Sequence, residues 1–324
     1  MSNLMRVLLY TPLFAIACQS APKIPNDRVA VFILAGQSNM EGQAVVDLAG
    51  DDYNQGKGTL VTLLRDPAQA AKFPQLRAAD GTFRSRDDVW VRYQREHGPL
   101  LAGKLGLGYS VYGDLHHFGP ELQFGHVLGD ALERPVLLIK TAWGGKDLYR
   151  DFRPPSASGT QGAYYTRMLA DIKAALAALP QEFPGYHGQG YELAGFVWYQ
   201  GWNDGCDPEH AVPEYETNLV HLIHDVRHDL NAPNLPIVVG ELTGPWVIAP
   251  GTWDTLRKAQ CAATKRTEFA GNVAFVMTHD FVRLPAESPN ESHGHHEFGN
   301  AETYLLVGNA LGQAMLDLLP ATGR

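Results

Sequence analysis

The chain has 324 residues, of which 45% are hydrophobic and 19% charged, with 33 glycines and 21 prolines. This is ordinary globular usage, and it excludes collagen-like, coiled-coil and wholly disordered chains. Lys and Arg number 26 against 35 Asp and Glu, which gives a formal net charge of −9. Because no basic run is present, a nucleic-acid partner is not expected.

The first residues have the composition of an export signal. Arg6 is followed by an apolar run, residues 7–17, which is too short to span a bilayer and ends in small residues. We therefore predict a signal peptide over residues 1–17 and a linker over residues 18–28. Because Cys18 follows directly, this end also resembles a bacterial lipoprotein signal. A lipid anchor at Cys18 and simple release both stay open, so an exported protein is expected in the periplasm, on the cell surface or secreted.

From residue 29 onward, short apolar runs rich in Val, Ile and Phe alternate with longer amphipathic segments. Nearly continuous apolar runs are typical of strands that are buried on both faces. The predicted strands are 29–34, 135–140, 194–199, 235–240 and 272–277, and the predicted helices are 120–132, 164–179, 214–230, 253–266 and 304–319. This alternation predicts a three-layer α/β/α sandwich around an open, parallel, five-stranded sheet.

One segment breaks this rhythm. Residues 50–118 are rich in Gly, Asp and Arg and contain hairpin-like pieces such as residues 88–93. No linker bounds the segment, so we interpret it as an insertion at one end of the sheet. The chain beyond the linker, residues 29–324, is then a single domain.

Four polar loops hold the residues that are suited to chemistry. In an open parallel sheet, ligands bind beyond the carboxyl ends of the strands, where these loops are expected. The loops are AGQSNMEG (35–42), TAWGGK (141–146), WYQGWND (198–204) and ESHGHHE (291–297). Paired glycines allow the backbone to approach a ligand closely, and Asn and Gln are neutral donors of the kind that an oxyanion hole needs. Each loop taken singly is also compatible with a structural turn.

Together these blocks resemble the SGNH hydrolase superfamily, and more closely its sialate O-acetylesterase-type branch, which includes acetylxylan esterases of carbohydrate esterase family six. GQSNM at 36–40 is the most specific mark. WYQGWND resembles the WxQGExD of that branch, with Trp202 in place of the usual Glu, and HHEFGNAETY at 295–304 resembles the terminal His block. The resemblance implies a flavodoxin-like fold and an exported serine esterase that removes O-acetyl groups from carbohydrate without a metal or organic cofactor.

Carried over by position, the resemblance implies Ser38 as nucleophile and His296 as general base. It also implies an oxyanion hole made by the N–H groups of Ser38 and Gly145 and the side chain of Asn203, with Gln200 assisting. Acyl transfer chemistry requires the same parts, namely a base within reach of the hydroxyl and fixed donors for the tetrahedral oxyanion.

The superfamily usually has an Asp three residues before this His, but His293 occupies that position here. The acid is then Asp280, Glu291 or neither, which would leave a Ser–His dyad. We favour Asp280, because a strand end holds a side chain more rigidly than a loop does.

Three tryptophans, Trp143, Trp202 and Trp246, lie in or beside the strand-end loops. Such rings are either buried or stacked on sugar faces, and we expect Trp143 and Trp202 to bind substrate. Cys206 and Cys261 have no metal-like spacing, and the sequence does not decide whether they pair.

Two other functions compete with the esterase. One is a non-catalytic carbohydrate-binding protein on the same fold, suggested by the irregular acid position and by Trp202. The other is metal-dependent hydrolysis through His293, His295 and His296, which would be sensitive to chelators. We expect no metal site, because the resemblance already employs His296 as the base.

Overall fold

The computed structural model describes residues 27–244 and 251–320. The predicted signal peptide, Cys18 and Trp246 lie outside the described residues. Within the described ranges, no helix is long and apolar enough to cross a membrane.

A seven-stranded sheet forms the centre of the molecule, in the order β4-β3-β6-β1-β7-β8-β9. Neighbouring strands are parallel, except for the antiparallel pair β3 and β4. The strands are β1 (Val29–Gly36), β3 (Arg86–Gln94), β4 (Leu100–Leu105), β6 (Val136–Ala142), β7 (Tyr191–Tyr199), β8 (Ile237–Gly240) and β9 (Val273–Val276). The five predicted strands are confirmed as the parallel block β6-β1-β7-β8-β9.

The prediction of five strands is wrong by two, and the segment interpreted as an insertion supplies both. β3 pairs with β6 and extends the sheet, and β4 closes the new edge. Along β3 the buried side chains Val89, Val91 and Tyr93 alternate with the half-exposed Trp90 and Arg92. A strand near a sheet edge needs only one apolar face, so β3 lacks the continuous apolar run by which the other strands were identified.

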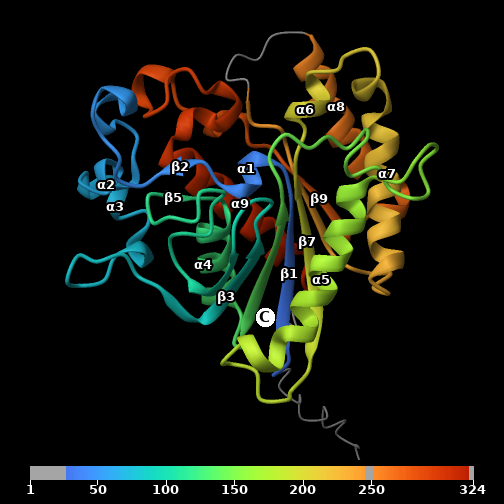
Figure 1. Cartoon of the computed structure of the whole chain (residues 1–324), viewed down its shortest axis with the longest axis horizontal. Coiled ribbons are helices and arrows are strands. Elements are labelled where there is room, and N and C mark those ends of the chain that lie inside the picture. The colour runs from blue at the N-terminus through green and yellow to red at the C-terminus, as the bar shows by residue number, and fades with distance from the viewer. Residues whose placement is uncertain (1–26, 245–250, 321–324) are drawn as a thin grey trace, which may run out of the picture.

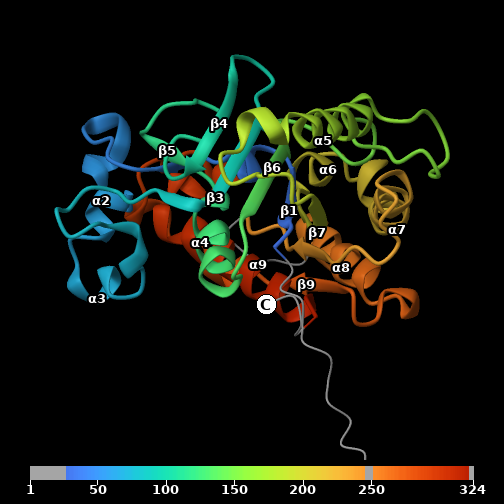
Figure 2. The same ribbon diagram turned by 90° about the horizontal axis from the view of Figure 1, so that it is seen from below.

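Helices cover both faces of the sheet (Figures 1 and 2). One layer contains α4 (Glu121–Ala131) and α9 (Ala301–Leu318), and the other contains α5 (Ala163–Glu182), α7 (Ala211–Asp229) and α8 (Thr252–Thr264). Successive side chains of β1 enter opposite cores: Val31 and Ile33 pack in the layer of α5, α7 and α8, whereas Phe32 and Leu34 pack in that of α4 and α9. This double burial explains the continuous apolar runs, and all five predicted helices are confirmed.

Short helices and strands lie outside the central sheet and its covering helices. They are α1 (Ser38–Glu41), β2 (Ala44–Val45), α2 (Leu60–Leu63), α3 (Pro67–Ala70), β5 (His117–Phe118) and α6 (Trp202–Gly205), with 3-10 segments at 51–56, 74–76, 267–269, 279–281, 285–287 and 294–299. Leu60 and Leu64 pack with Phe118 and Tyr304 in a third, smaller core beside the start of α9.

The strand order places a ligand site beside β1. Six neighbouring strands, from β3 to β9, are parallel, and the five of them that the sequence predicted run 2-1-3-4-5 when numbered along the chain. The chain therefore crosses from one side of β1 to the other between β6 and β7. In such sheets the loops that follow the two neighbouring strands diverge and leave a crevice at the carboxyl ends. The loops after β1 and β7 meet at this point, with α1 at the upper end of β1 in Figure 1.

Candidate active site

Ser38 is the first residue of α1 and directly follows the end of β1. Its side chain is largely buried, with 7% of the residue exposed. The N–H groups of Ser38 and Gly145 donate no hydrogen bond to any of the described residues. Both N–H groups are therefore available as hydrogen-bond donors.

Alternate side chains around Ser38 hold the neighbouring loops in place. Gln37 holds the loop after β7: its Oε1 accepts from the N–H groups of Gly201 (3.1 Å) and Asn203 (3.4 Å), and its Nε2 donates to Asn203 Oδ1 (3.0 Å). Because the Asn203 oxygen is engaged, the amide is oriented with its Nδ2 group available as a donor. The side chain of Asn203 thus meets the requirement for an oxyanion donor.

Glu41 holds the loop after β6. Its carboxylate accepts from the Tyr93 hydroxyl (2.6 Å) and from the N–H of Gly144, and burial raises its pKa to about 7. A Cβ atom on Gly144 would lie 2.9 Å from Glu41 Oε2 and 3.6 Å from Ser38 Cβ. Only glycine lets this loop approach so closely, and its neighbour Gly145 faces open space.

A buried ion pair supports α1 from below. Lys140 Nζ donates to Glu121 Oε2 (2.7 Å) and to the carbonyl oxygens of Glu41 (2.7 Å) and Tyr109 (2.5 Å). Both charged side chains are fully buried. The pair fixes the backbone of Glu41 and therefore the height of α1 above the sheet.

Gln200, expected to assist in the oxyanion hole, does not reach it. Its Nε2 donates to Asp204 Oδ2 (2.6 Å) and to the Lys146 carbonyl (3.1 Å), and its Oε1 accepts from the Tyr215 hydroxyl (3.0 Å). Both ends of the amide are committed, and the residue is 2% exposed. The expected role is therefore wrong, because buried partners consume every group that could contact an ester.

Asp204, the last residue of the WYQGWND block, has a structural role that the sequence did not assign to it. Its buried carboxylate accepts from the N–H groups of Leu148 and Tyr149, as well as from Gln200. Burial raises its pKa to about 7. The contacts join the loop after β7 to the loop after β6, so that Asn203 and Gly145 keep a constant relative position.

His296 lies in the 3-10 segment 294–299, which packs against α1. Its ring is half-buried, with the ring centroid of His295 at 4.1 Å. Burial, together with His295 and His293, lowers the pKa of His296 to about 3. Within the described part of the chain, no hydrogen bond or ion pair joins this ring to Ser38 or to a carboxylate.

The two proposed acids do not contact His296. The Asp280 side chain is 89% exposed and lies beside His279, 3.3 Å from its Nε2. Glu291 accepts from Asn54 (3.3 Å) instead. The geometry therefore gives no support to our preference for Asp280 as catalytic acid, since the strand end directs its side chain into solvent.

The tryptophans divide into a buried one and an accessible pair. Trp143 is fully buried, donates to the Gln94 carbonyl (3.2 Å) and stacks on Phe152, so its expected contact with substrate is wrong. Trp202 is half-buried and stacks on Trp253, with ring centroids 4.6 Å apart. Its ring also lies 5.8 Å from that of His295.

No group of three or more His, Cys, Asp or Glu that could hold a metal ion occurs among residues 27–244 and 251–320. Cys206 and Cys261 are both free thiols.

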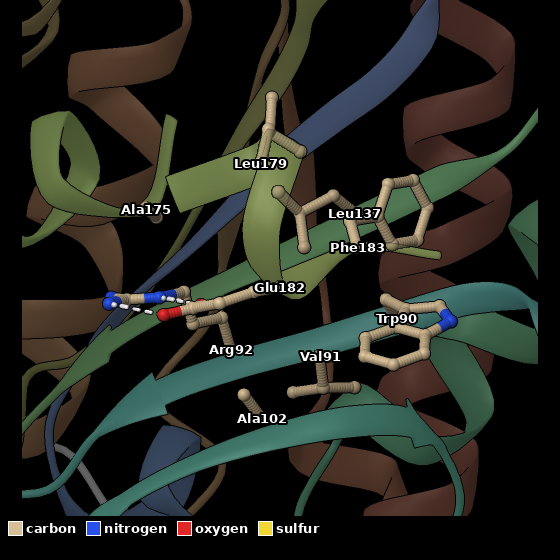
Figure 3. A pocket seen from close by; sticks show the side chains of 9 residues that line it. All are labelled: Trp90, Val91, Arg92, Ala102, Leu137, Ala175, Leu179, Glu182 and Phe183. Atoms are coloured by element: carbon tan, nitrogen blue, oxygen red, sulfur yellow. Dashed lines mark hydrogen bonds and ion pairs between the residues drawn. The ribbon is translucent and has the colours of Figure 1, made fainter. Parts of the chain in front are cut away.

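A separate apolar pocket lies between α5 and the sheet (Figure 3). Its wall includes Trp90, Leu179 and Phe183, beside the ion pair of Arg92 and Glu182 (2.7 Å). The pocket has room for about one water molecule. Leu137, at the start of β6, also lines it, so it lies far along the sheet from Ser38 and plays no part in the site.

Residues 28–316 match the model of a family described as carbohydrate esterase, sialic acid-specific acetylesterase. The chain belongs to this family. It is accordingly a carbohydrate esterase, a carboxylic ester hydrolase, as the sequence blocks predicted.

Individual relatives agree with this membership. The esterase is 26% identical over 274 residues to a probable carbohydrate esterase of Arabidopsis thaliana, which covers 83% of this chain and 85% of the relative. The crystal structure of that plant protein superposes with a TM-score of 0.56 and 21% identity over 90% of this chain and 98% of that one. A carbohydrate acetylesterase of Xanthomonas citri superposes with a TM-score of 0.50 and 13% identity over 88% of this chain and 55% of that one. These two superpositions show a shared fold.

Proposed function

We propose that the esterase removes O-acetyl groups from carbohydrate through an acyl-enzyme on Ser38. The observation that supports the proposal is that the loops after β6 and β7 both approach Ser38: an added Cβ atom on Gly144, next to Gly145, would lie 3.6 Å from Ser38 Cβ, and Gln37, next to Ser38, is hydrogen-bonded to Asn203. Ser38, Gly145 and Asn203 come from three separate loops, and each offers a group that acyl transfer requires. The strand order 2-1-3-4-5 also suits an SGNH-type, flavodoxin-like fold.

In the proposed reaction, the Ser38 hydroxyl attacks the ester carbonyl while His296 accepts its proton. The negative oxygen of the tetrahedral intermediate binds the N–H groups of Ser38 and Gly145 and the Asn203 amide. His296 then donates the proton to the departing sugar oxygen, which leaves an acetyl group on Ser38. Water, activated by the same imidazole, releases acetate and restores the serine.

The substrate class follows from the family and from the aromatic pair. The family description names sialic acid, and the Xanthomonas relative is described as a carbohydrate acetylesterase. We assign the sugar side of the substrate to Trp202, whose ring lies 5.8 Å from that of His295, and to Trp253, which stacks on Trp202. The pair offers an apolar surface to a sugar face. We also propose export through the signal at residues 1–17, with lipid attachment at Cys18 or release.

The decisive experiment compares the purified protein with its Ser38→Ala variant on 4-nitrophenyl acetate, acetylated xylan and O-acetylated sialic acid. We expect turnover of at least one acetylated carbohydrate and a loss of several orders of magnitude in the variant, with unchanged circular dichroism. Full activity of Ser38→Ala would refute the mechanism. An inactive wild-type protein that binds the sugars would instead indicate a carbohydrate-binding protein.

A further inference from the structure

Glu297 is a buried carboxylate that directly follows His296 in the chain. It is 1% exposed, and its Oε1 accepts from Asn39 Nδ2 (3.0 Å) and from the N–H of Gly244 (3.1 Å). It thereby joins three segments that are far apart in sequence: the segment 294–299, α1 and the loop after β8. The proposed acyl transfer on Ser38 does not involve this side chain.

The backbone at this point adopts an unusual conformation. Glu297 and Phe298 have φ values of 52° and 56°, in the left-handed region that side chains other than glycine rarely occupy. Two backbone hydrogen bonds retain it, from Asn290 N to Phe298 O (2.9 Å) and from Phe298 N to His293 O (3.1 Å). Strained residues of this kind persist where surrounding contacts fix them, and they are concentrated at functional sites.

Asn39, the neighbour of Ser38, contacts the chain on both sides of His296. Its Nδ2 donates to the His295 carbonyl (3.2 Å) as well as to Glu297. The Tyr304 hydroxyl donates to Asn39 Oδ1 (2.8 Å) and lies 3.2 Å from the His296 carbonyl oxygen. The hydrogen bond between Asn39, which follows Ser38, and Glu297, which follows His296, is thus the side-chain member of a small set of contacts that join the nucleophile's helix to the segment of the base.

The acid of a catalytic triad does two things: it holds the imidazole in position and it stabilises the imidazolium. We propose that Glu297 is a positioning residue that performs the first of these, through Asn39 and the main chain, while none of the residues that the structure describes performs the second. This inference rests on the proposed function. Glu297 thus positions the imidazole of His296, a role that we expected of Asp280 or Glu291 from the sequence.

The chemistry of Glu297 suits a neutral acceptor. Burial raises its pKa to about 8, and its Oε2 has no hydrogen-bond partner among the described residues. Only Oε1, which both protonation states offer as an acceptor, is used. A glutamine keeps this oxygen and the shape of the side chain, whereas a methionine keeps the volume and loses both bonds.

The test compares Glu297→Gln with Glu297→Met on 4-nitrophenyl acetate, with Asp280→Asn and Glu291→Gln as controls. We expect Glu297→Gln to remain within about threefold of the wild type, because both accepted bonds persist. We expect Glu297→Met to lower kcat by about 10²-fold, the order of loss that follows a 1 Å misplacement, with KM nearly unchanged. The acidic limb of the pH–rate profile should stay in place in both variants, because no ring partner is removed.

Full kcat in Glu297→Met would overturn the inference. A loss of activity in Glu297→Gln accompanied by a shifted acidic limb of the pH–rate profile would also overturn it, because Glu297 would then be a partner of the ring. If Glu297→Met does not fold, Asn39→Ala removes the same bond, together with those to the His295 carbonyl and the Tyr304 hydroxyl, and should also lower kcat. Full kcat in that variant also overturns the inference. If both variants fold, their losses should be less than additive, because they share one interaction. Ser38→Ala in the same assay separates the outcomes: loss of activity there, with full activity in Glu297→Met, refutes this inference alone.

Discussion

A carboxylate can be introduced at position 293, where the SGNH hydrolases that the sequence resembles usually have an Asp. His293 lies three residues before His296, is exposed, and has its ring centroid 6.4 Å from that of His296. The substitution His293→Asp replaces a group that lowers the pKa of His296 by one that raises it. If His296 is a base without an acid partner, this change should improve the enzyme.

The magnitude follows from the surroundings of the ring. Burial, His295 and His293 hold the pKa of His296 at about 3. A carboxylate within about 4–6 Å raises such a pKa by roughly 1–3 units. The neutral imidazole is the active form, so activity is lost as the pH falls through this pKa, and the acidic limb should move up from about 3 to roughly 4–6. Each unit stabilises the imidazolium by about 1.4 kcal/mol. Because the proton is only partly transferred in the transition state, we expect about a tenfold to hundredfold rise in kcat at neutral pH, below the ~10⁴ effect of a complete triad acid.

The assay is the pH dependence of kcat/KM for 4-nitrophenyl acetate in the wild type, His293→Asp and His293→Asn. The asparagine variant removes the histidine without adding a charge, so the difference between the two variants isolates the carboxylate. An acidic limb near pH 6.5 or above in the pH profile of the wild type would refute the reasoning, because it would require a carboxylate already in contact with His296. Equal profiles of the two variants would show that the new acid does not act on the ring.

Three further predictions concern other parts of the site. Asn203→Ala should lower kcat by about 10²–10³-fold with little change in KM, because an oxyanion donor acts in the transition state; a change confined to KM would assign it to substrate binding. Lys140→Met should lower the free energy of unfolding by about 3–5 kcal/mol in urea titrations, because Glu121 is left buried without its partner, and a second change, Glu121→Leu, should restore much of the loss. Gly205→Ala would place a Cβ atom 2.1 Å from Trp253 Cζ3 and displace that ring. The KM for acetylated carbohydrate should then rise severalfold, while kcat/KM for 4-nitrophenyl acetate stays constant. Equal effects on both substrates would exclude a sugar-binding role for Trp202 and Trp253.

Local pattern in the sequence was sufficient for most of the frame. The strands β1, β6, β7, β8 and β9 were predictable because burial on both faces demands continuous apolar runs, which are visible in any window of the chain. The helices followed from their own periodicity, and the strand-to-loop order placed Ser38, Gly145 and Asn203 at one edge of the sheet. The hairpin β3–β4 was missed as part of the sheet because an edge strand needs only an alternating pattern.

Only the tertiary structure decided which hydrogen-bond partners each side chain of the site has and whether that side chain is accessible. Gln200 and Trp143 sit in the expected loops, yet distant partners such as Tyr215 and Gln94 bury or occupy them. The tie between Asn39 and Glu297 spans 258 positions of the chain. A spacing rule reports which residues follow a strand, but the direction of a loop side chain depends on contacts made only when remote segments pack together. For this reason the sequence by itself determined the fold class and the nucleophile expected from it. Only the folded chain shows that no carboxylate of residues 27–244 and 251–320 is hydrogen-bonded to the ring of His296.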